Sequence, residues 1–209
     1  MALLQRDPFP SEERQEKKSN ILIDILQIGV ILFSIFVIIY LFIATPNEVY
    51  GPSMEPSFYN GELLLTNKFI QLFGETNLQS ITGNYKRGDI VIFRSDRVDK
   101  DLIKRVVAIG GDTIMIRNGN VFVNGQKTNE LYLASETKTA SSDYLKEGKS
   151  REVPEHSYAV LGDNRGNSLD SRSSLIGFVS RKSLKGRVFV RFWPLNHLNM
   201  ITRPDYDKE

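Results

Sequence analysis

Residues 102–109, Leu-Ile-Lys-Arg-Val-Val-Ala-Ile, carry the pattern that decides the fold of most of this chain. The run is short, apolar and rich in β-branched side chains, which is typical of a β-strand. No long amphipathic helix pattern follows residue 45, whereas similar runs recur along the chain. They lie at 62–66, 89–93, 113–116, 121–123, 158–161 and 187–192. The sequence therefore predicts an all-β fold for residues 45–209.

One part of this region differs in composition. Residues 126–157 are polar and rich in Ser, Thr, Lys and Glu. Just before them, Asn118-Gly119-Asn120 separates two apolar runs, which indicates a β-hairpin. We predict a small β or loop insertion at about 113–157 and a further surface loop at 71–84.

A long apolar segment precedes the strands. From Ile25 to Ala44 the chain has no charged residue and one strongly polar one, Gln27. A helix of that length rises about 30 Å, the thickness of a bilayer's hydrocarbon core. The helix would lack the polar face expected of a core helix, and Phe42-Ile43-Ala44 is a poor signal-peptide cleavage site. We predict a tail at 1–20, a transmembrane helix at 21–44 and a separate domain at 45–209.

Basic residues set the predicted orientation. Arg6, Arg14, Lys17 and Lys18 precede the span, and the first basic residue after it is Lys68. The positive-inside rule then places the N-terminus in the cytoplasm and residues 45–209 outside it. We predict a single-pass plasma-membrane protein, and an organellar membrane remains an alternative.

Composition excludes several kinds of chemistry. The chain has no Cys, so disulfide frameworks, thiol catalysis and Cys-ligated zinc are excluded. Two His residues, His156 and His197, leave little for a metal site, although counting alone leaves a Ser-His-Asp triad open. Lys and Arg total 27 against 25 Asp and Glu, a balance that gives no reason to expect nucleic-acid binding. We expect no metal and no cofactor.

A serine nucleophile needs a base beside it, and a lysine can serve when burial lowers its pKa by as much as ~3–5 units. Ser53 stands in the run Gly51-Pro52-Ser53-Met54-Glu55-Pro56. Two prolines and a glycine make this a stiff turn that would aim the hydroxyl. Lys104 stands within the strand-like run at 102–109, where alternation gives it apolar neighbours on its own face. The alternative is a solvated lysine on a polar strand face.

A third segment, residues 162–172, reads Gly-Asp-Asn-Arg-Gly-Asn-Ser-Leu-Asp-Ser-Arg. Its composition also fits a long turn that hydrogen-bonds its own backbone. It is not a phosphate-binding loop, because it has no Gly-Lys-Ser/Thr ending and no helix after it. It is not a calcium loop, because its acidic residues are wrongly spaced and the terminal Glu is missing. Asp170 and Arg172 are placed to pair across one strand face.

Together these segments resemble the type I signal peptidases, membrane-bound serine endopeptidases of the Ser-Lys dyad class. The matching segments are 51–56, 87–93, 104–107 with 111–112, 162–172, and 186–188 with 191–195. The resemblance covers most of residues 45–198. It implies a signal-peptidase-like β fold and removal of N-terminal signal peptides from exported preproteins.

The resemblance also implies roles for particular residues. Ser53 corresponds to the nucleophile, Lys104 to the general base, Ser168 to a hydroxyl that orients the amine, Asp170 and Arg172 to a supporting ion pair, and Gly162 to a small residue near the lysine. Arg105 is expected to be structural. The chain departs from the family at Gly51, where some members have a hydroxyl that donates to the oxyanion, so a second donor must be another backbone N–H or water. It also has Gly110 in place of a common proline, and one span where members often have two.

The implied substrates are preproteins with small side chains at the first and third positions before the cut. The corresponding apolar pocket walls would be Val49, Met54, Phe58, Leu102 and Ile103. An extended substrate could add as a strand beside residues 48–51 and 101–104. Membrane lipid and the protein translocation machinery are the other expected partners.

Two other functions remain open at this stage. One is a self-cleaving Ser-Lys protease related to repressors, although this chain has a span and no helical DNA-binding domain. The other is a non-catalytic, membrane-tethered β module of the export machinery, which would show no processing activity.

Overall fold

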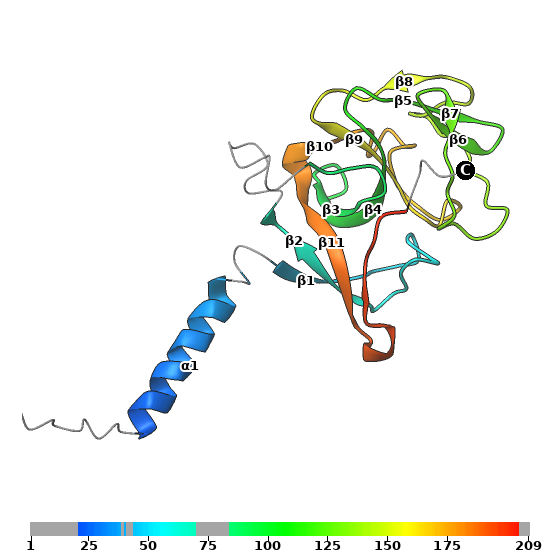
Figure 1. Cartoon of the computed structure of the whole chain (residues 1–209). Helices are drawn as coiled ribbons and strands as arrows, with labels where there is room; N and C mark the ends of the chain where they lie inside the picture. Colours follow the sequence, from blue (N-terminus) through cyan, green and yellow to red (C-terminus); the bar gives the residue numbers. More distant parts are fainter. Residues whose placement is uncertain (1–20, 39, 41–43, 70–83, 205–209) are drawn as a thin grey trace, which may run out of the picture. The chain divides into compact units, whose positions relative to one another are not determined.

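The computed structural model describes residues 21–38, 40, 44–69 and 84–204, and the chain divides into two compact units after Ile38 (Figure 1). The predicted tail at 1–20 lies outside the described residues, as does nearly all of the predicted loop at 71–84.

The described part of the first unit is the helix α1 (Ile21–Ile38). It is apolar apart from Asp24 in its first turn, Gln27 and Ser34, whose hydroxyl donates to the Val30 carbonyl. Its 18 residues rise about 27 Å, close to the thickness of a hydrocarbon core. Among the described residues it is the one helix long and apolar enough to span a membrane. The predicted span reached Ala44, but that residue pairs with Asn67 at the start of a strand.

The second unit is built mainly of antiparallel strands, so the predicted all-β fold is confirmed. Its larger sheet has the order β1-β2-β11-β3-β4-β9-β10, with β12 paired to β11. The strands are β1 (Ala44–Glu48), β2 (Leu63–Asn67), β3 (Ile90–Ser95), β4 (Lys100–Ile109), β9 (Ser157–Leu161), β10 (Val179–Ser180), β11 (Leu184–Trp193) and β12 (Asn199–Met200). Two short 3-10 helices, η2 (Arg181–Ser183) and η3 (Leu195–His197), flank β11. Each of the predicted strands overlaps an observed one.

Strand β1 was not predicted, and it carries the polar run Ala-Thr-Pro-Asn-Glu. Its apolar content is low and it contains Pro46, two features that argue against a strand. However, β1 lies at the edge of the sheet and, among the described residues, pairs only with β2, so the missing N–H of Pro46 disturbs hydrogen bonding on one side at most.

A smaller sheet occupies the region of the predicted insertion (Figure 1). Its strands are β5 (Thr113–Arg117), β6 (Asn120–Val123), β7 (Gln126–Lys127) and β8 (Arg151–Glu152), in the order β7-β6-β5-β8. Asn118 and Gly119 connect β5 to β6 with φ values of 51° and 76°, the conformation of a tight two-residue hairpin turn. The predicted hairpin is therefore present. Between β7 and β8 the chain forms turns and loops.

Among the described residues of the second unit, three clusters of buried apolar side chains form the core, and β4 contributes to each of them. Val107 belongs to the cluster that joins β4 and β9 to the smaller sheet, and Val106 belongs to a second cluster. Ile103 packs against the third cluster, which contains Met54 and Phe58. Strand β4 is therefore central, and a charged side chain in its middle is costly unless it is paired or neutral.

Candidate active site

Ser53 lies on a turn between β1 and β2 that is held by its own backbone. The Phe58 N–H donates to the Met54 carbonyl at 2.9 Å, and both side chains are buried in the third apolar cluster. Gly51 has φ of +78°, where a side chain would be strained, and its N–H donates to Oδ1 of Asn60 at 2.8 Å. The turn is thus anchored on both sides of Ser53, in keeping with the stiffness expected from its prolines and glycine.

Lys104 projects from the middle of β4 to the Ser53 turn. Its side-chain Nζ lies 2.7 Å from Oγ of Ser53 and 2.7 Å from the carbonyl oxygen of Ile103. The residue is only 2% exposed. The structure therefore brings the predicted nucleophile and base into direct contact, and the alternative of a solvated lysine does not describe this residue.

Burial lowers the pKa of Lys104 from 10.5 to about 8, because the charged amine loses its hydration. Asp170 and Asp163 oppose the shift by favouring the charged form, and Arg172 adds to it. A pKa near 8 raises the neutral fraction of the amine at pH 7 about 300-fold over a free lysine, to roughly a tenth of the molecules. The amine can thus accept a proton near neutral pH.

The 162–172 segment packs against this pair. Asp170 forms a buried ion pair with Arg172, with its oxygens 2.8 Å from Nε and 2.9 Å from Nη2, and it also accepts the Gly162 N–H at 3.0 Å. The Asn164 N–H donates to the Ser53 carbonyl at 3.1 Å. The predicted ion pair is therefore formed, but it lies on a segment of turns and not across a strand face as predicted. The segment also contacts the backbone of the Ser53 turn.

Gly162 lies where a side chain has no room. A Cβ built there would come within 2.1 Å of Oγ of Ser168 and 2.6 Å of the Ser53 carbonyl oxygen. Oγ of Ser168 is itself buried and has no hydrogen-bond partner among the described residues. The structure thus places Ser168 beside Gly162 without a bond to the lysine, and its role in orienting the amine stays a prediction.

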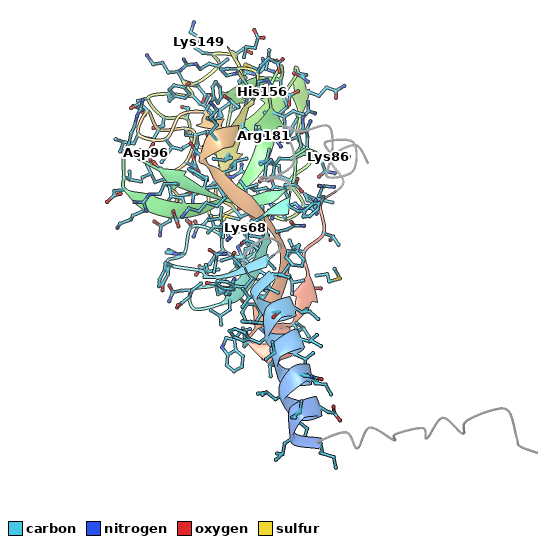
Figure 2. The ribbon with its side chains drawn as sticks, turned by 90° about the vertical axis from the view of Figure 1, so that its left-hand side faces the viewer. Lys68, Lys86, Asp96, Lys149, His156 and Arg181 are labelled. Atoms are coloured by element: carbon cyan, nitrogen blue, oxygen red, sulfur yellow. The ribbon has the colours of Figure 1, made fainter. Side chains whose placement is uncertain are left out.

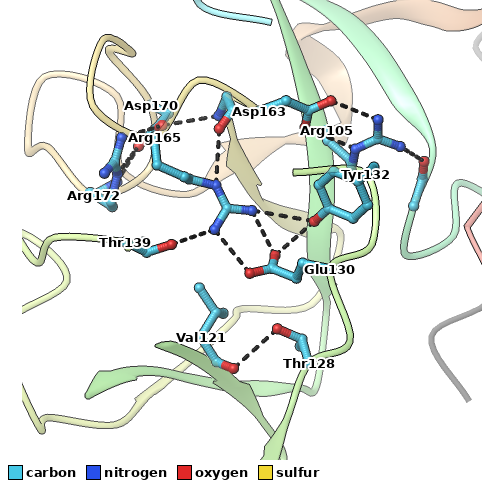
Figure 3. Close-up of polar contacts among 12 residues, drawn as sticks. Arg105, Val121, Thr128, Glu130, Tyr132, Thr139, Asp163, Arg165, Asp170 and Arg172 are labelled. Atoms are coloured by element: carbon cyan, nitrogen blue, oxygen red, sulfur yellow. Dashed lines mark hydrogen bonds and ion pairs between the residues drawn. The ribbon is translucent and has the colours of Figure 1, made fainter. Parts of the chain in front are cut away.

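Arg105, next to Lys104, points into a buried ion pair with Asp163. Its Nε and Nη2 donate to the two carboxylate oxygens at 2.9 and 2.7 Å, and Nη1 donates to the Gly88 carbonyl at 3.1 Å. Its guanidinium carbon also lies 3.9 Å from the ring centre of Tyr132 (Figure 3). These contacts fit the structural role expected for Arg105.

No role was predicted from the sequence for Arg165, Glu130 or Tyr132, yet these residues form a polar cluster beside Gly162, centred on the buried Arg165 side chain (Figure 3). Arg165 belongs to the quoted 162–172 segment, whereas Glu130 and Tyr132 belong to the polar insertion. No local pattern connects residues so far apart along the chain, so only the folded structure reveals the pairing.

The predicted pocket walls do not all lie together. Val49, Met54 and Phe58 are almost fully buried in the third apolar cluster, and Ile103 packs against the same cluster. Leu102 packs against the second cluster, because neighbouring residues of a strand point to opposite faces. Their roles in substrate binding stay predictions.

The two histidines lie outside this site. His156 is exposed and, together with Arg181, lines a pocket of about 550 Å³. Both residues are labelled in Figure 2. Neither Ser53 nor Lys104 lines that pocket. The His197 side chain is half exposed, and its Nδ1 lies 3.6 Å from Oε1 of Glu62. Within the described ranges no group of three His, Asp or Glu residues is arranged to hold a metal ion.

The chain is similar to known proteins over most of its length. The family model described as "Signal peptidase, peptidase S26" matches residues 22–193. Signal peptidase I P of Bacillus subtilis subsp. natto is 38% identical over 193 residues, which cover 91% of this chain and 97% of that protein. Signal peptidase IB of Staphylococcus aureus (strain COL) is 33% identical over 202 residues, covering 91% and 99%. A crystal structure of a signal peptidase I from Enterococcus faecalis covers 50% of this chain and 96% of its own, at 30% identity and a TM-score of 0.42.

Proposed function

The chain belongs to the signal peptidase family of peptidase S26 and is an enzyme, and from this membership we propose that Ser53 and Lys104 form its catalytic dyad. The observation that carries the proposal is the 2.7 Å contact between Nζ of Lys104 and Oγ of Ser53. The lysine is almost fully buried, so its pKa lies low enough for it to act as a base.

In the acylation step, the Ser53 hydroxyl gives its proton to the neutral Lys104 amine as Oγ attacks the scissile carbonyl carbon. The tetrahedral intermediate then collapses with cleavage of the C–N bond. The Lys104 ammonium returns the proton to the departing amine, so the mature protein leaves with a neutral N-terminus and the signal peptide remains as an ester on Ser53.

In the deacylation step, the neutral Lys104 amine takes a proton from a water molecule that attacks the ester carbon. The ammonium then protonates Oγ as the ester bond breaks, which releases the signal peptide and regenerates the dyad. One lysine thus serves as base and acid in both half-reactions.

The backbone N–H of Ser53 is one candidate donor to the oxyanion of the tetrahedral intermediate. It donates to no acceptor among the described residues, so it is available to a substrate oxygen. The neighbouring Gly51 N–H is already bonded to the side chain of Asn60. A second donor must therefore be another backbone N–H or water.

Strand β4 offers a place for an extended substrate. Along residues 101–104 it pairs with β3, but its pairing with β9 begins only at Arg105. The other edge of residues 101–104 is therefore outside the β4–β9 ladder and suits the addition of a substrate strand between it and residues 48–51. We propose preproteins with small side chains at the first and third positions before the cut as the substrates, with Ile103 in the wall that rejects bulk.

The apolar helix α1 supports anchoring in a membrane, since its length and composition match those of a spanning segment. We propose a single span in a plasma membrane with the N-terminus in the cytoplasm, an orientation that rests on the basic residues before the helix. Membrane lipid and, in the cell, the translocation machinery would then be neighbours of the enzyme.

The dyad is tested by cleavage of a labelled preprotein by the purified full chain and by the variants Ser53→Ala and Lys104→Ala. We expect both variants to lose cleavage, and we expect Lys149→Ala, which changes an exposed lysine of the insertion, to retain it. Cleavage at the normal rate by either dyad variant would refute the assignment. Cleavage of the chain itself, with the preprotein left intact, would favour the self-cleaving alternative.

A further inference from the structure

Arg165 joins the polar insertion to the 162–172 segment from a fully buried position. Its side chain is 0% exposed and that of Glu130 is 10% exposed. Nη1 and Nη2 of Arg165 lie 3.0 and 2.6 Å from the two carboxylate oxygens of Glu130, and Nη1 also donates to Oγ1 of Thr139 (Figure 3). A two-pronged pair of this kind fixes both distance and orientation.

The third donor of Arg165 points to the active site. Its Nε donates to the Gly162 carbonyl at 3.0 Å. Gly162 in turn donates its N–H to Asp170. It packs so closely against Ser168 and the Ser53 carbonyl that there is no room for a side chain. The position of the Gly162 backbone beside the dyad thus depends on where Arg165 is held.

Tyr132 extends the same contact to Arg105 and Asp163. Its hydroxyl donates to Oε1 of Glu130 at 2.7 Å and accepts from Nη2 of Arg165 at 3.3 Å. Its ring lies against the guanidinium of Arg105, which is paired with Asp163. Residues 128–140, which we call the insertion arm, therefore contact both Arg165 and the Arg105–Asp163 pair (Figure 3).

From these contacts we propose that the insertion arm is a positioning element of the active site, in which Glu130 and Tyr132 hold the 162–172 segment closed against the Ser53–Lys104 pair. The proposal rests on the proposed function of that dyad, and it assigns a role to the polar insertion. Glu130 and Tyr132 are positioning residues, since their contacts to the dyad run through Arg165 and Arg105.

The electrostatic consequence follows from burial. A guanidinium that loses its carboxylate partner in a buried site is strongly unfavourable, so Arg165 would turn toward water and release the Gly162 carbonyl. Water would then enter beside the Lys104 amine. Within the described part of the chain, the charged groups that act on this amine are Asp163, Asp170 and Arg172, all from the 162–172 segment, and none of them is removed by changing Glu130.

The test compares Glu130→Gln with the matched control Glu136→Gln, an exposed carboxylate of the same arm, using the full chain in detergent. We expect Glu130→Gln to lower kcat on a preprotein about tenfold while KM changes less than twofold. We also expect the acidic limb of the kcat/KM profile to move from about pH 8 to higher pH, because a rehydrated amine regains a higher pKa. The control should match the parent in both measurements.

Two outcomes would overturn the proposal. One is an unchanged kcat and pH profile in Glu130→Gln. The other is a loss of activity equal to the loss of folded protein measured by thermal unfolding, with the acidic limb of the kcat/KM profile at the same pH as in the parent. An ion pair that only stabilises the fold would not alter the titration of the lysine.

If Glu130→Gln fails to fold, Tyr132→Phe gives the same readout, because it removes one hydroxyl and keeps the ring against Arg105. We expect a smaller shift of the limb in the same direction, and an unchanged limb would overturn the proposal. Failure of the dyad itself would be seen separately, as cleavage that survives in Ser53→Ala.

Discussion

Replacing Lys104 with Met is expected to abolish cleavage and yet stabilise the fold at neutral pH. The fold lowers the pKa of the amine from 10.5 to about 8, so the unfolded chain binds the proton more tightly than the folded chain does. That difference of about 2.5 units costs the folded state about 3 kcal/mol at pH 7. Met fills a similar volume and carries no charge, so the variant avoids this cost.

Two lost contacts offset part of the gain. Nζ of Lys104 contacts Oγ of Ser53 and the Ile103 carbonyl, and each contact contributes about 1 kcal/mol. The net gain for the variant at pH 7 is therefore about 1 kcal/mol. The parent gains stability as the pH rises from 8 to 10.5, because in that window the folded amine is neutral and unfolding must take up a proton, which becomes less favourable as the pH rises. At pH 10.5 the variant should be the less stable protein by about 2 kcal/mol.

The measurement is urea unfolding of the full chain in detergent, followed by circular dichroism at pH 7 and pH 10.5. The relative stability of parent and Lys104→Met should change by about 3 kcal/mol between these conditions. Lys149→Met, at an exposed lysine, should show no such change. A stability difference that is the same at both pH values would mean that the buried amine ionises like a free one, and the assignment of Lys104 as the base would fail.

The other predictions concern catalysis. The kcat/KM for a preprotein should rise about tenfold from pH 7 to pH 9 and then level off, since the pKa of Lys104 is about 8; an amine that titrates near 10.5 would give a rise of about 100-fold with no plateau. Gly162→Ala should lower kcat at least about 100-fold, because its Cβ would displace Ser168 and the Ser53 carbonyl, and a variant that retains normal kcat would contradict the close packing at this position.

Local pattern predicted much of the fold. Strand periodicity is a local property, so the runs that became β2, β3, β4, β5, β6, β9 and β11 could be recognised from short windows. Strand β1 could not, because its polar residues and Pro46 are tolerated only at a sheet edge, and a short window does not show where the edge lies. The predicted helix end at residue 44 was wrong, since Ala44 begins β1, because an apolar run does not mark where a helix stops.

The residue types in short motifs were enough to select Ser53 and Lys104 as the candidate nucleophile and base, because a stiff turn and an apolar strand can each be recognised from neighbouring residues. The split of Leu102 and Ile103 between two apolar clusters follows from alternation, but which cluster each joins depends on packing. The pairing of Glu130 with Arg165 had no signal at all, because nothing in the insertion indicates which distant cation it will meet.

The amino-acid sequence alone determined the class of this protein, because secondary structure and motif chemistry arise from interactions between residues close along the chain. Tertiary structure alone decided the acidity of Lys104 and the closure of the insertion arm on the 162–172 segment. Both depend on excluding water, and water is excluded only when β4, the Ser53 turn and the 162–172 segment, which are distant in sequence, pack together.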